Sequence, residues 1–139
     1  MSEINTYLIF NGNCADAMRF YQTTLGGKLE MMTHGQSPMA DQMPPGSAER
    51  ILHSRLDFDG GVLGGMDGMA SEPNKGASGF SLSLVYKTPA EAKGIFEALA
   101  KGGKVTMPFE KTFWAEGFGM LVDRFGTPWM INGAMVPTV

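Results

Sequence analysis

The stretch LGGKL at residues 25–29 decides the fold, because it returns as KGGKV at residues 101–105, an offset of 76 positions. At the same offset Phe20 falls on Phe96. In each copy an alternating apolar segment leads into a helical pattern, then a Gly-Gly pair, then another extended segment. A motif that recurs in the same context predicts two copies of one structural unit.

One helix is predicted on the N-terminal side of each Gly-Gly pair. The first begins after Asn13 and covers residues 15–25, and the glycines that follow supply a left-handed C-terminal position. The second has Thr88 as its N-cap and Pro89 at its first helical position, and it runs to Lys101. Each copy therefore contributes a single helix.

Period-two alternation and turn signals predict four strands in each copy. These strands cover residues 4–11, 27–34, 50–58 and 61–67 in the first copy and 79–87, 103–107, 113–122 and 127–133 in the second. The fold class is thus α+β, with two strand-helix-three-strand modules, 1–67 and 79–135, in a single domain spanning 1–139. One helix covers only one face of a four-stranded sheet, so two curved mixed sheets are expected to form a cleft. A long loop is predicted at 36–48.

Composition argues against several classes of function. The 139 residues carry 11 basic and 14 acidic side chains, a net charge of −3, without the clustered Lys and Arg of nucleic-acid-binding proteins. No segment has the length and apolarity of a membrane span, and the N-terminus does not resemble a secretory signal. The one cysteine, Cys14, cannot form an internal disulfide. We therefore predict a cytoplasmic protein that binds neither nucleic acid nor a membrane.

The strand predicted at 50–58 separates two sets of side chains. Alternation places Ser54 and Leu56 on the helix-covered face, and His53, Arg55 and Asp57 on the face toward the cleft or solvent. An imidazole beside a guanidinium could orient an anionic or carbonyl-bearing ligand, so His53 and Arg55 are candidate ligand-binding residues. A histidine whose role is packing fits the same pattern.

Two further strands supply candidate ligand-binding residues. Thr6 and Phe10 alternate with other side chains on the first strand, and Ser81 and Ser83 do so in the second copy. At the 76-residue offset Thr6 falls on Leu82 and not on a serine. The alignment of the two strands must therefore be shifted by one residue if Thr6 and the two serines are to lie on the same face of their sheets. A solvated surface would explain the serines equally well.

The segment at 113–119 contains three aromatic residues, one acid and two flexible glycines. Aromatic walls with one carboxylate suit a flat organic ligand, so Trp114 and Glu116 are candidate binding residues, and Met130 could line an adaptable apolar cavity. A hydrophobic strand in a module or dimer interface, with Glu116 solvated, is the alternative.

These features together resemble the vicinal oxygen chelate superfamily, which includes glyoxalase I, extradiol dioxygenases, fosfomycin-modifying enzymes and bleomycin-sequestering proteins. The paired units and the turn at 123–126 carry this resemblance over nearly the whole chain. The stretches FNGNCADA at 10–17, TFWAEGFG at 112–119 and PWMIN at 128–132 resemble the PhnB-like branch, often labelled demethylubiquinone methyltransferase-like. The resemblance implies a homodimer that binds a small organic ligand.

Metal enzymes of this superfamily hold a divalent cation with His, Gln or Glu from strands of both units. The matching positions here are Thr6, Gly64 or Gly65, Ser81 or Ser83, and Met130. Hydroxyl and thioether groups are poor ligands for such a cation, so no metal site and no cofactor are predicted. Enzymes that use S-adenosylmethionine usually have a glycine-rich turn that leads from a strand into a helix. Neither Gly60-Gly61 nor the glycines at 117 and 119 open a predicted helix here, so the methyltransferase label has no support from the residues.

Three functions follow as hypotheses. The first is a metal-free binding protein of the bleomycin-resistance type. The second is a metal-independent enzyme with His53 as general base, Glu116 as acid and Arg55 fixing an oxyanion. The third is a metal-dependent lyase or isomerase with atypical ligands such as His53, Glu116 or Asp67.

Overall fold

A computed structural model describes residues 2–38, 41, 46, 48–68 and 78–136. The chain divides into two compact units, unit 1 at residues 1–75 and unit 2 at residues 76–139.

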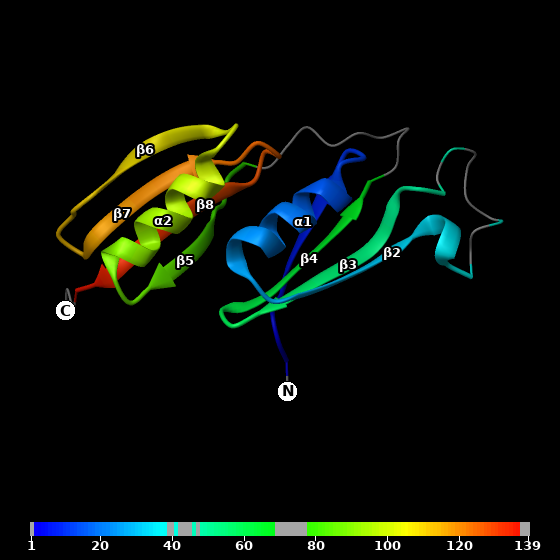
Figure 1. Cartoon of the computed structure of the whole chain (residues 1–139), viewed down its shortest axis with the longest axis horizontal. Coiled ribbons are helices and arrows are strands. Elements are labelled where there is room, and N and C mark those ends of the chain that lie inside the picture. The colour runs from blue at the N-terminus through cyan, green and yellow to red at the C-terminus, as the bar shows by residue number, and fades with distance from the viewer. Residues whose placement is uncertain (1, 39–40, 42–45, 47, 69–77, 137–139) are drawn as a thin grey trace. The chain divides into compact units, whose positions relative to one another are not determined.

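Unit 1 has the predicted order of one strand, one helix and three strands (Figure 1). Its elements are β1 (Thr6–Phe10), α1 (Cys14–Leu25), β2 (Lys28–Thr33), the short 3-10 helix η1 (His34–Gln36), β3 (Ile51–Phe58) and β4 (Gly61–Asp67). The sheet order is β1-β4-β3-β2, with β1 parallel to β4 and the other pairs antiparallel. Helix α1 covers one face of this sheet and leaves the other without a helix (Figure 1).

Unit 2 repeats this arrangement. Its elements are β5 (Leu82–Tyr86), α2 (Pro89–Ala100), β6 (Lys104–Glu110), β7 (Ala115–Val122) and β8 (Pro128–Met135). The sheet order is β5-β8-β7-β6, with β5 parallel to β8, and α2 covers one face (Figure 1). The α+β fold class with two βαβββ modules and mixed sheets is therefore confirmed.

The predicted 76-residue offset holds over the first strand of each unit without any shift. Strand β1 at Thr6–Phe10 corresponds residue by residue to β5 at Leu82–Tyr86. Leu8 is buried and Leu84 half-buried on the helix-covered faces, and Tyr7 corresponds to Ser83, both exposed. The expected one-residue shift is thus corrected, because the apolar alternation is in phase in both strands.

Each Gly-Gly pair lies where the chain turns from helix to strand. Gly26, Gly27 and Gly102 all have positive φ, which favours glycine. A Cβ on Gly27 would collide with the carbonyl oxygen of Asp57, and one on Gly103 with that of Val122. The repeated glycines are therefore required by close backbone contact as well as by the turn.

The first helix begins at Cys14, with Asn13 at the N-cap position, but the Asn13 side chain makes no capping bond. The cap comes instead from Asp67 at the end of β4, which is 3% exposed. One carboxylate oxygen of Asp67 accepts hydrogen bonds from the backbone N–H groups of Gly12 and Cys14, at 2.9 and 3.0 Å. The other oxygen accepts a hydrogen bond from the backbone N–H of Ile51 at 2.8 Å. One buried carboxylate thus joins the start of α1 to two strands.

The cap of the second helix is local, as predicted. The Thr88 hydroxyl accepts a hydrogen bond from the Glu91 backbone N–H at 3.2 Å, and Pro89 is the first helical residue. The turn between β7 and β8 is held by Asp123, which accepts from the backbone of Phe125 and Thr127 and from the indole N–H of Trp129. The predicted turn at 123–126 is therefore built around one buried carboxylate.

The strand boundaries differ from the prediction mainly at the ends. β1 and β5 are shorter than the predicted 4–11 and 79–87, and Gly79, at φ +81°, precedes the strand proper. β6 and β8 continue beyond the predicted ends at 107 and 133. The predicted loop at 36–48 includes 39–40, 42–45 and 47, which lie outside the described residues.

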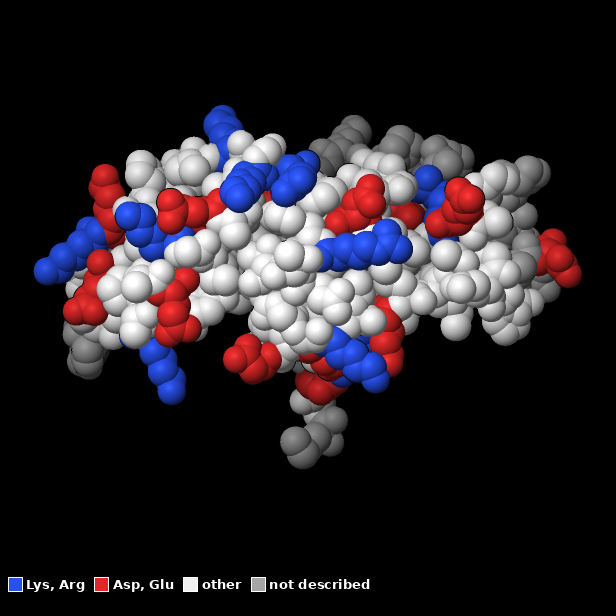
Figure 2. Space-filling view, in the orientation of Figure 1, with Lys and Arg blue, Asp and Glu red and all other residues white. Residues whose placement is uncertain are grey.

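Neither helix of the described residues has the length and apolar character to cross a membrane. Basic and acidic side chains are interspersed over the face shown in Figure 2. This mixed distribution agrees with the balanced composition.

Candidate functional site

The helix-free face of unit 1 carries the side chains that alternate away from α1. Ser54 and Leu56 on β3 are fully buried, whereas His53, Arg55 and Asp57 are exposed. The predicted orientation of β3 is therefore correct. The register places Met32 opposite His53 and Glu30 opposite Arg55, so β2 continues this face.

Tyr7 and His53 form a pair on this face. The Tyr7 hydroxyl lies 2.9 Å from His53 Nδ1, and the two rings are nearly parallel, with centroids 5.8 Å apart and planes inclined by 16°. Partial burial is the larger effect that raises the pKa of the Tyr7 hydroxyl, and the electrostatic effect of the Cys14 thiol group is the smaller one, so the phenol stays protonated at neutral pH. Tyr7 was not among the predicted site residues, because its partner lies 46 positions away in the sequence.

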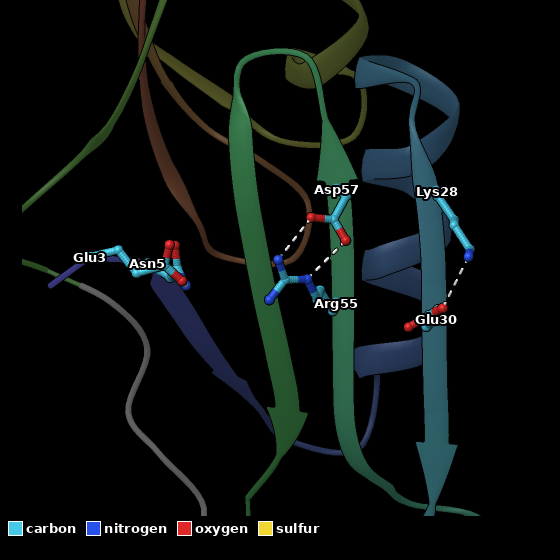
Figure 3. A network of polar contacts seen from close by, with 6 residues as sticks. All are labelled: Glu3, Asn5, Lys28, Glu30, Arg55 and Asp57. Atoms are coloured by element: carbon cyan, nitrogen blue, oxygen red, sulfur yellow. Dashed lines mark hydrogen bonds and ion pairs between the residues drawn. The ribbon is translucent and has the colours of Figure 1, made fainter. Parts of the chain in front are cut away.

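Arg55 is engaged by its own strand (Figure 3). Its Nε and one terminal nitrogen donate to the two oxygens of Asp57 at 2.8 and 3.0 Å. These bonds hold the pKa of the Asp57 carboxyl below its usual value. The guanidinium predicted to fix a ligand oxyanion is therefore already paired with a carboxylate. On the adjoining β2, Lys28 pairs with Glu30 at 3.3 Å.

Unit 2 carries an aromatic cluster of Phe113, Trp114 and Phe118. The Phe113 and Trp114 rings meet edge to face with centroids 4.9 Å apart, and Trp114 meets Phe118 in the same way at 5.1 Å. Alternation places Phe118 on the helix-free face, since Gly117 and Gly119 on either side face the rings of Phe96 and Phe109. The predicted concentration of aromatic side chains thus forms a contiguous cluster.

Asn132 adds a polar group to this face. The register places it between Val85 on β5 and Phe118 on β7. Asn132 is 5% exposed, and within the described part of the chain no hydrogen bond of its amide is found. No sequence signal singled it out, because its neighbours come from two other strands. A side-chain amide at this position can donate a hydrogen bond to a ligand or accept one from it.

The other predicted binding residues are distributed as follows. Met130 lies on the helix-free face of unit 2, beside Ser83 and Met120, and Glu116 is exposed on β7. Ser81 precedes β5 and is half-buried. Glu116 belongs to unit 2 and His53 to unit 1, so neither unit contains the proposed acid and base together.

Two predicted residues lie on the helix-covered face of unit 1. Phe10 is buried against the sheet near Met18 of α1, as the surroundings of Gly65 show. Thr6 shares the face of Leu8 and Phe10, and its register partner is the buried Leu63. The expectation that Thr6 and Phe10 line the open face is corrected, because the apolar alternation of β1 directs both toward α1.

Two reactive side chains of unit 1 have structural roles. Cys14 is fully buried, and burial is the largest of the effects that raise its thiol pKa to about 12, while a hydrogen bond with Ser54 acts in the other direction. The thiol is therefore protonated and inert at neutral pH. Asp67, suggested as a metal ligand, accepts three backbone hydrogen bonds.

The positions at which the superfamily resemblance places metal ligands do not fit a divalent cation. They hold the half-buried Thr6 on the helix-covered face, Gly64 or Gly65, Ser81 or Ser83, and Met130. Thioether and neutral hydroxyl groups bind such ions weakly. In the described ranges, no three His, Cys, Asp or Glu residues are grouped as metal ligands would be.

Known proteins resemble the chain over nearly its whole length. Protein YjdN of Escherichia coli (strain K12) is 38% identical over 138 residues, 93% of each chain. The crystal structure of protein PA1353 from Pseudomonas aeruginosa is 44% identical, with a TM-score of 0.88 over 96% of this chain and 98% of that one. A putative 3-demethylubiquinone-9 3-methyltransferase, PhnB protein, from Bacillus cereus is 24% identical, with a TM-score of 0.79 over 96% and 100%.

The likeness of fold extends further. A glyoxalase/bleomycin resistance protein/dioxygenase family enzyme from Burkholderia phytofirmans has a TM-score of 0.62 at 16% identity, over 94% of this chain and 96% of that one. A family model described as 3-demethylubiquinone-9 3-methyltransferase matches residues 2–132. The chain therefore belongs to the family described as 3-demethylubiquinone-9 3-methyltransferase.

Proposed function

We propose that the protein binds a small, flat organic molecule on the helix-free face of unit 2, without a metal ion. The observation that carries this proposal is the aromatic cluster of Phe113, Trp114 and Phe118 beside the amide of Asn132. Aromatic side chains provide apolar contact to a ring system, and one well-placed polar group orients it. Met120 and Met130 extend the apolar surface and can adapt to its shape.

The metal-independent enzyme hypothesis is less well supported. It requires His53, Glu116 and Arg55 to act on one substrate molecule. Arg55, its third residue, is paired with Asp57. A homodimer, a cytoplasmic location and the lack of a nucleic-acid partner remain part of the proposal on the basis of family resemblance and composition.

The two tryptophans allow a direct test of binding. Trp114 is half-buried in the cluster, whereas Trp129 is 2% exposed and donates its indole N–H to Asp123. We expect a ligand found among quinones and planar antibiotics to quench Trp114 emission saturably. The same ligand should raise the free energy of unfolding by about 2.7 kcal/mol at a hundred times its Kd.

Substitutions in the proposed site of unit 2 show whether the ligand binds there or at another place on the protein. Trp114→Phe should abolish the quenching, and Asn132→Ala should weaken binding about tenfold through loss of a hydrogen bond. Glu97→Gln on the exposed surface of α2, on the opposite side of the sheet, is the matched control and should bind normally. A ligand that binds Trp114→Phe and Asn132→Ala with unchanged Kd would place the site elsewhere.

Metal content is tested independently. Protein purified without an affinity tag should contain well below one equivalent of zinc, nickel or iron, and EDTA should leave its Tm and ligand affinity unchanged. This is expected because the matching positions offer glycine, hydroxyl and thioether groups. Near-stoichiometric metal that chelation removes together with ligand binding would overturn the metal-free part of the proposal.

A further inference from the structure

The Tyr7–His53 pair depends on a glycine between the two strands that carry it. Tyr7 on β1 is in register with Gly64 on β4, and β4 separates β1 from β3, which carries His53. A Cβ on Gly64 would lie 2.6 Å from Tyr7 Cδ1 and 2.9 Å from Cε1. The missing side chain therefore lets the phenol ring lie across β4 and reach the imidazole.

The chemistry of the two groups gives the hydrogen bond a direction. A phenol O–H is a stronger donor than a neutral imidazole N–H, and an imidazole nitrogen is a stronger acceptor than a phenol oxygen. Burial favours the protonated phenol. The O–H of Tyr7 therefore donates to Nδ1 of His53, which requires the neutral imidazole to carry its own proton on Nε2.

The surroundings suit one kind of ligand. Ile9 and Met32 expose apolar side chains on the same face, 54% and 43% exposed, and Met32 is in register with His53. The Asp57 carboxylate, which is exposed on the same strand, is bonded to Arg55, so this acceptor already has a donor. An N–H donor flanked by apolar side chains matches a molecule with an acceptor oxygen and an apolar body.

We propose that Tyr7 is a positioning residue that holds His53 in the Nε2–H tautomer, so that Nε2–H binds a carboxylate or carbonyl oxygen of a small organic ligand on the helix-free face of unit 1. The apolar part of this ligand rests on Ile9 and Met32. The inference uses only contacts within unit 1 and does not depend on the site proposed for unit 2.

The tautomer can be read by NMR without any ligand. In protein labelled with 15N-histidine, long-range 1H–15N correlations at pH 9 distinguish a protonated ring nitrogen from an unprotonated one. The chain has two histidines, and His53→Gln identifies the signals of His53. We expect an unprotonated Nδ1 and a protonated Nε2 for His53 in the wild-type protein.

Two variants test the role of Tyr7. Tyr7→Phe removes the donor but keeps the ring, and Gly64→Ala keeps both side chains but displaces the ring of Tyr7. Both should shift the two nitrogen signals of His53 toward the average of a tautomer mixture. Gly94→Ala, whose Cβ would meet nothing within 4 Å, is the matched glycine control and should leave them unchanged. A wild-type Nδ1–H tautomer, or unchanged His53 signals in Tyr7→Phe, would overturn the assignment.

The acceptor oxygen is tested with benzoate and with benzylamine, a cationic probe that has the same ring but no acceptor oxygen. Benzoate should shift the His53 Nε2 signal and bind at least tenfold more tightly than benzylamine. Tyr7→Phe should weaken benzoate binding about threefold to tenfold, as expected for one less well-oriented hydrogen bond. Equal binding of the two probes, or benzoate binding that leaves the His53 signals unmoved, would contradict the proposed site.

Discussion

Replacement of Asp67 by alanine is expected to lower the free energy of unfolding by about 3–5 kcal/mol, because three backbone N–H groups would lose their acceptor. The donors belong to Gly12, Cys14 and Ile51, and Asp67 is 3% exposed, so water cannot readily replace the carboxylate. Urea unfolding followed by circular dichroism measures the loss.

Asp67→Asn provides the matched comparison. The amide oxygen can still accept from Gly12 and Cys14, but the amide nitrogen cannot accept from Ile51. The loss should therefore be smaller, about 1–2 kcal/mol. Amide hydrogen exchange locates the effect, with faster exchange at Ile51 in the asparagine variant and at all three donors in the alanine variant. Equal stability of Asp67→Ala and wild type would show that these bonds do not hold the helix to the sheet.

Gly133→Ala is the second substitution expected to have a large effect. A Cβ on Gly133 would lie 2.7 Å from Pro89 Cα, 2.8 Å from Ala92 Cβ and 2.9 Å from the Thr88 carbonyl oxygen. Two of these atoms are backbone, so the start of α2 would have to move away from β8. We expect a loss of about 3 kcal/mol, typical of severe overpacking. Trp129, four residues earlier in β8, should report the change in urea unfolding followed by fluorescence.

Gly94→Ala is the corresponding control in the helix itself. Nothing lies within 4 Å of the added Cβ, and φ of Gly94 is not positive. Alanine is the better helix former, so this variant should gain about 0.5–1 kcal/mol. If both substitutions change stability by the same amount, the contact between Gly133 and the start of α2 is not a close one in solution.

The parts of the fold that follow local rules could be predicted from the sequence. Thr88 and Pro89 mark a helix start with their own chemistry, and the structure shows Thr88 as the cap. The alternation of β3 predicted the correct face of His53 and Arg55, because the buried Ser54 lies between these two residues and the buried Leu56 follows Arg55. Period and capping residues are signals that a single sequence contains in full.

The parts that depend on strand register could not be predicted in this way. Asn13 is a good N-cap residue by type, yet the cap comes from Asp67, which is distant in sequence and adjacent only because β4 pairs with β1. Tyr7 meets His53 for the same kind of reason, across Gly64. A threonine at the start of β1 also gives no local sign of its face, and only the pairing with the buried Leu63 shows that Thr6 lies on the helix-covered side.

The parallel pairing of β1 with β4 has a consequence for synthesis on the ribosome. Thr6 pairs with Leu63, and the cap of α1 is supplied by Asp67, so the earliest part of unit 1 finds its partners only when the last strand of that unit has been translated. Closing such a distant contact costs chain entropy before any pairing is gained. The nascent chain up to β3 can pair only β2 with β3, and a two-stranded pair is marginally stable by itself, so we expect the sheet of unit 1 to be completed only after β4 has emerged.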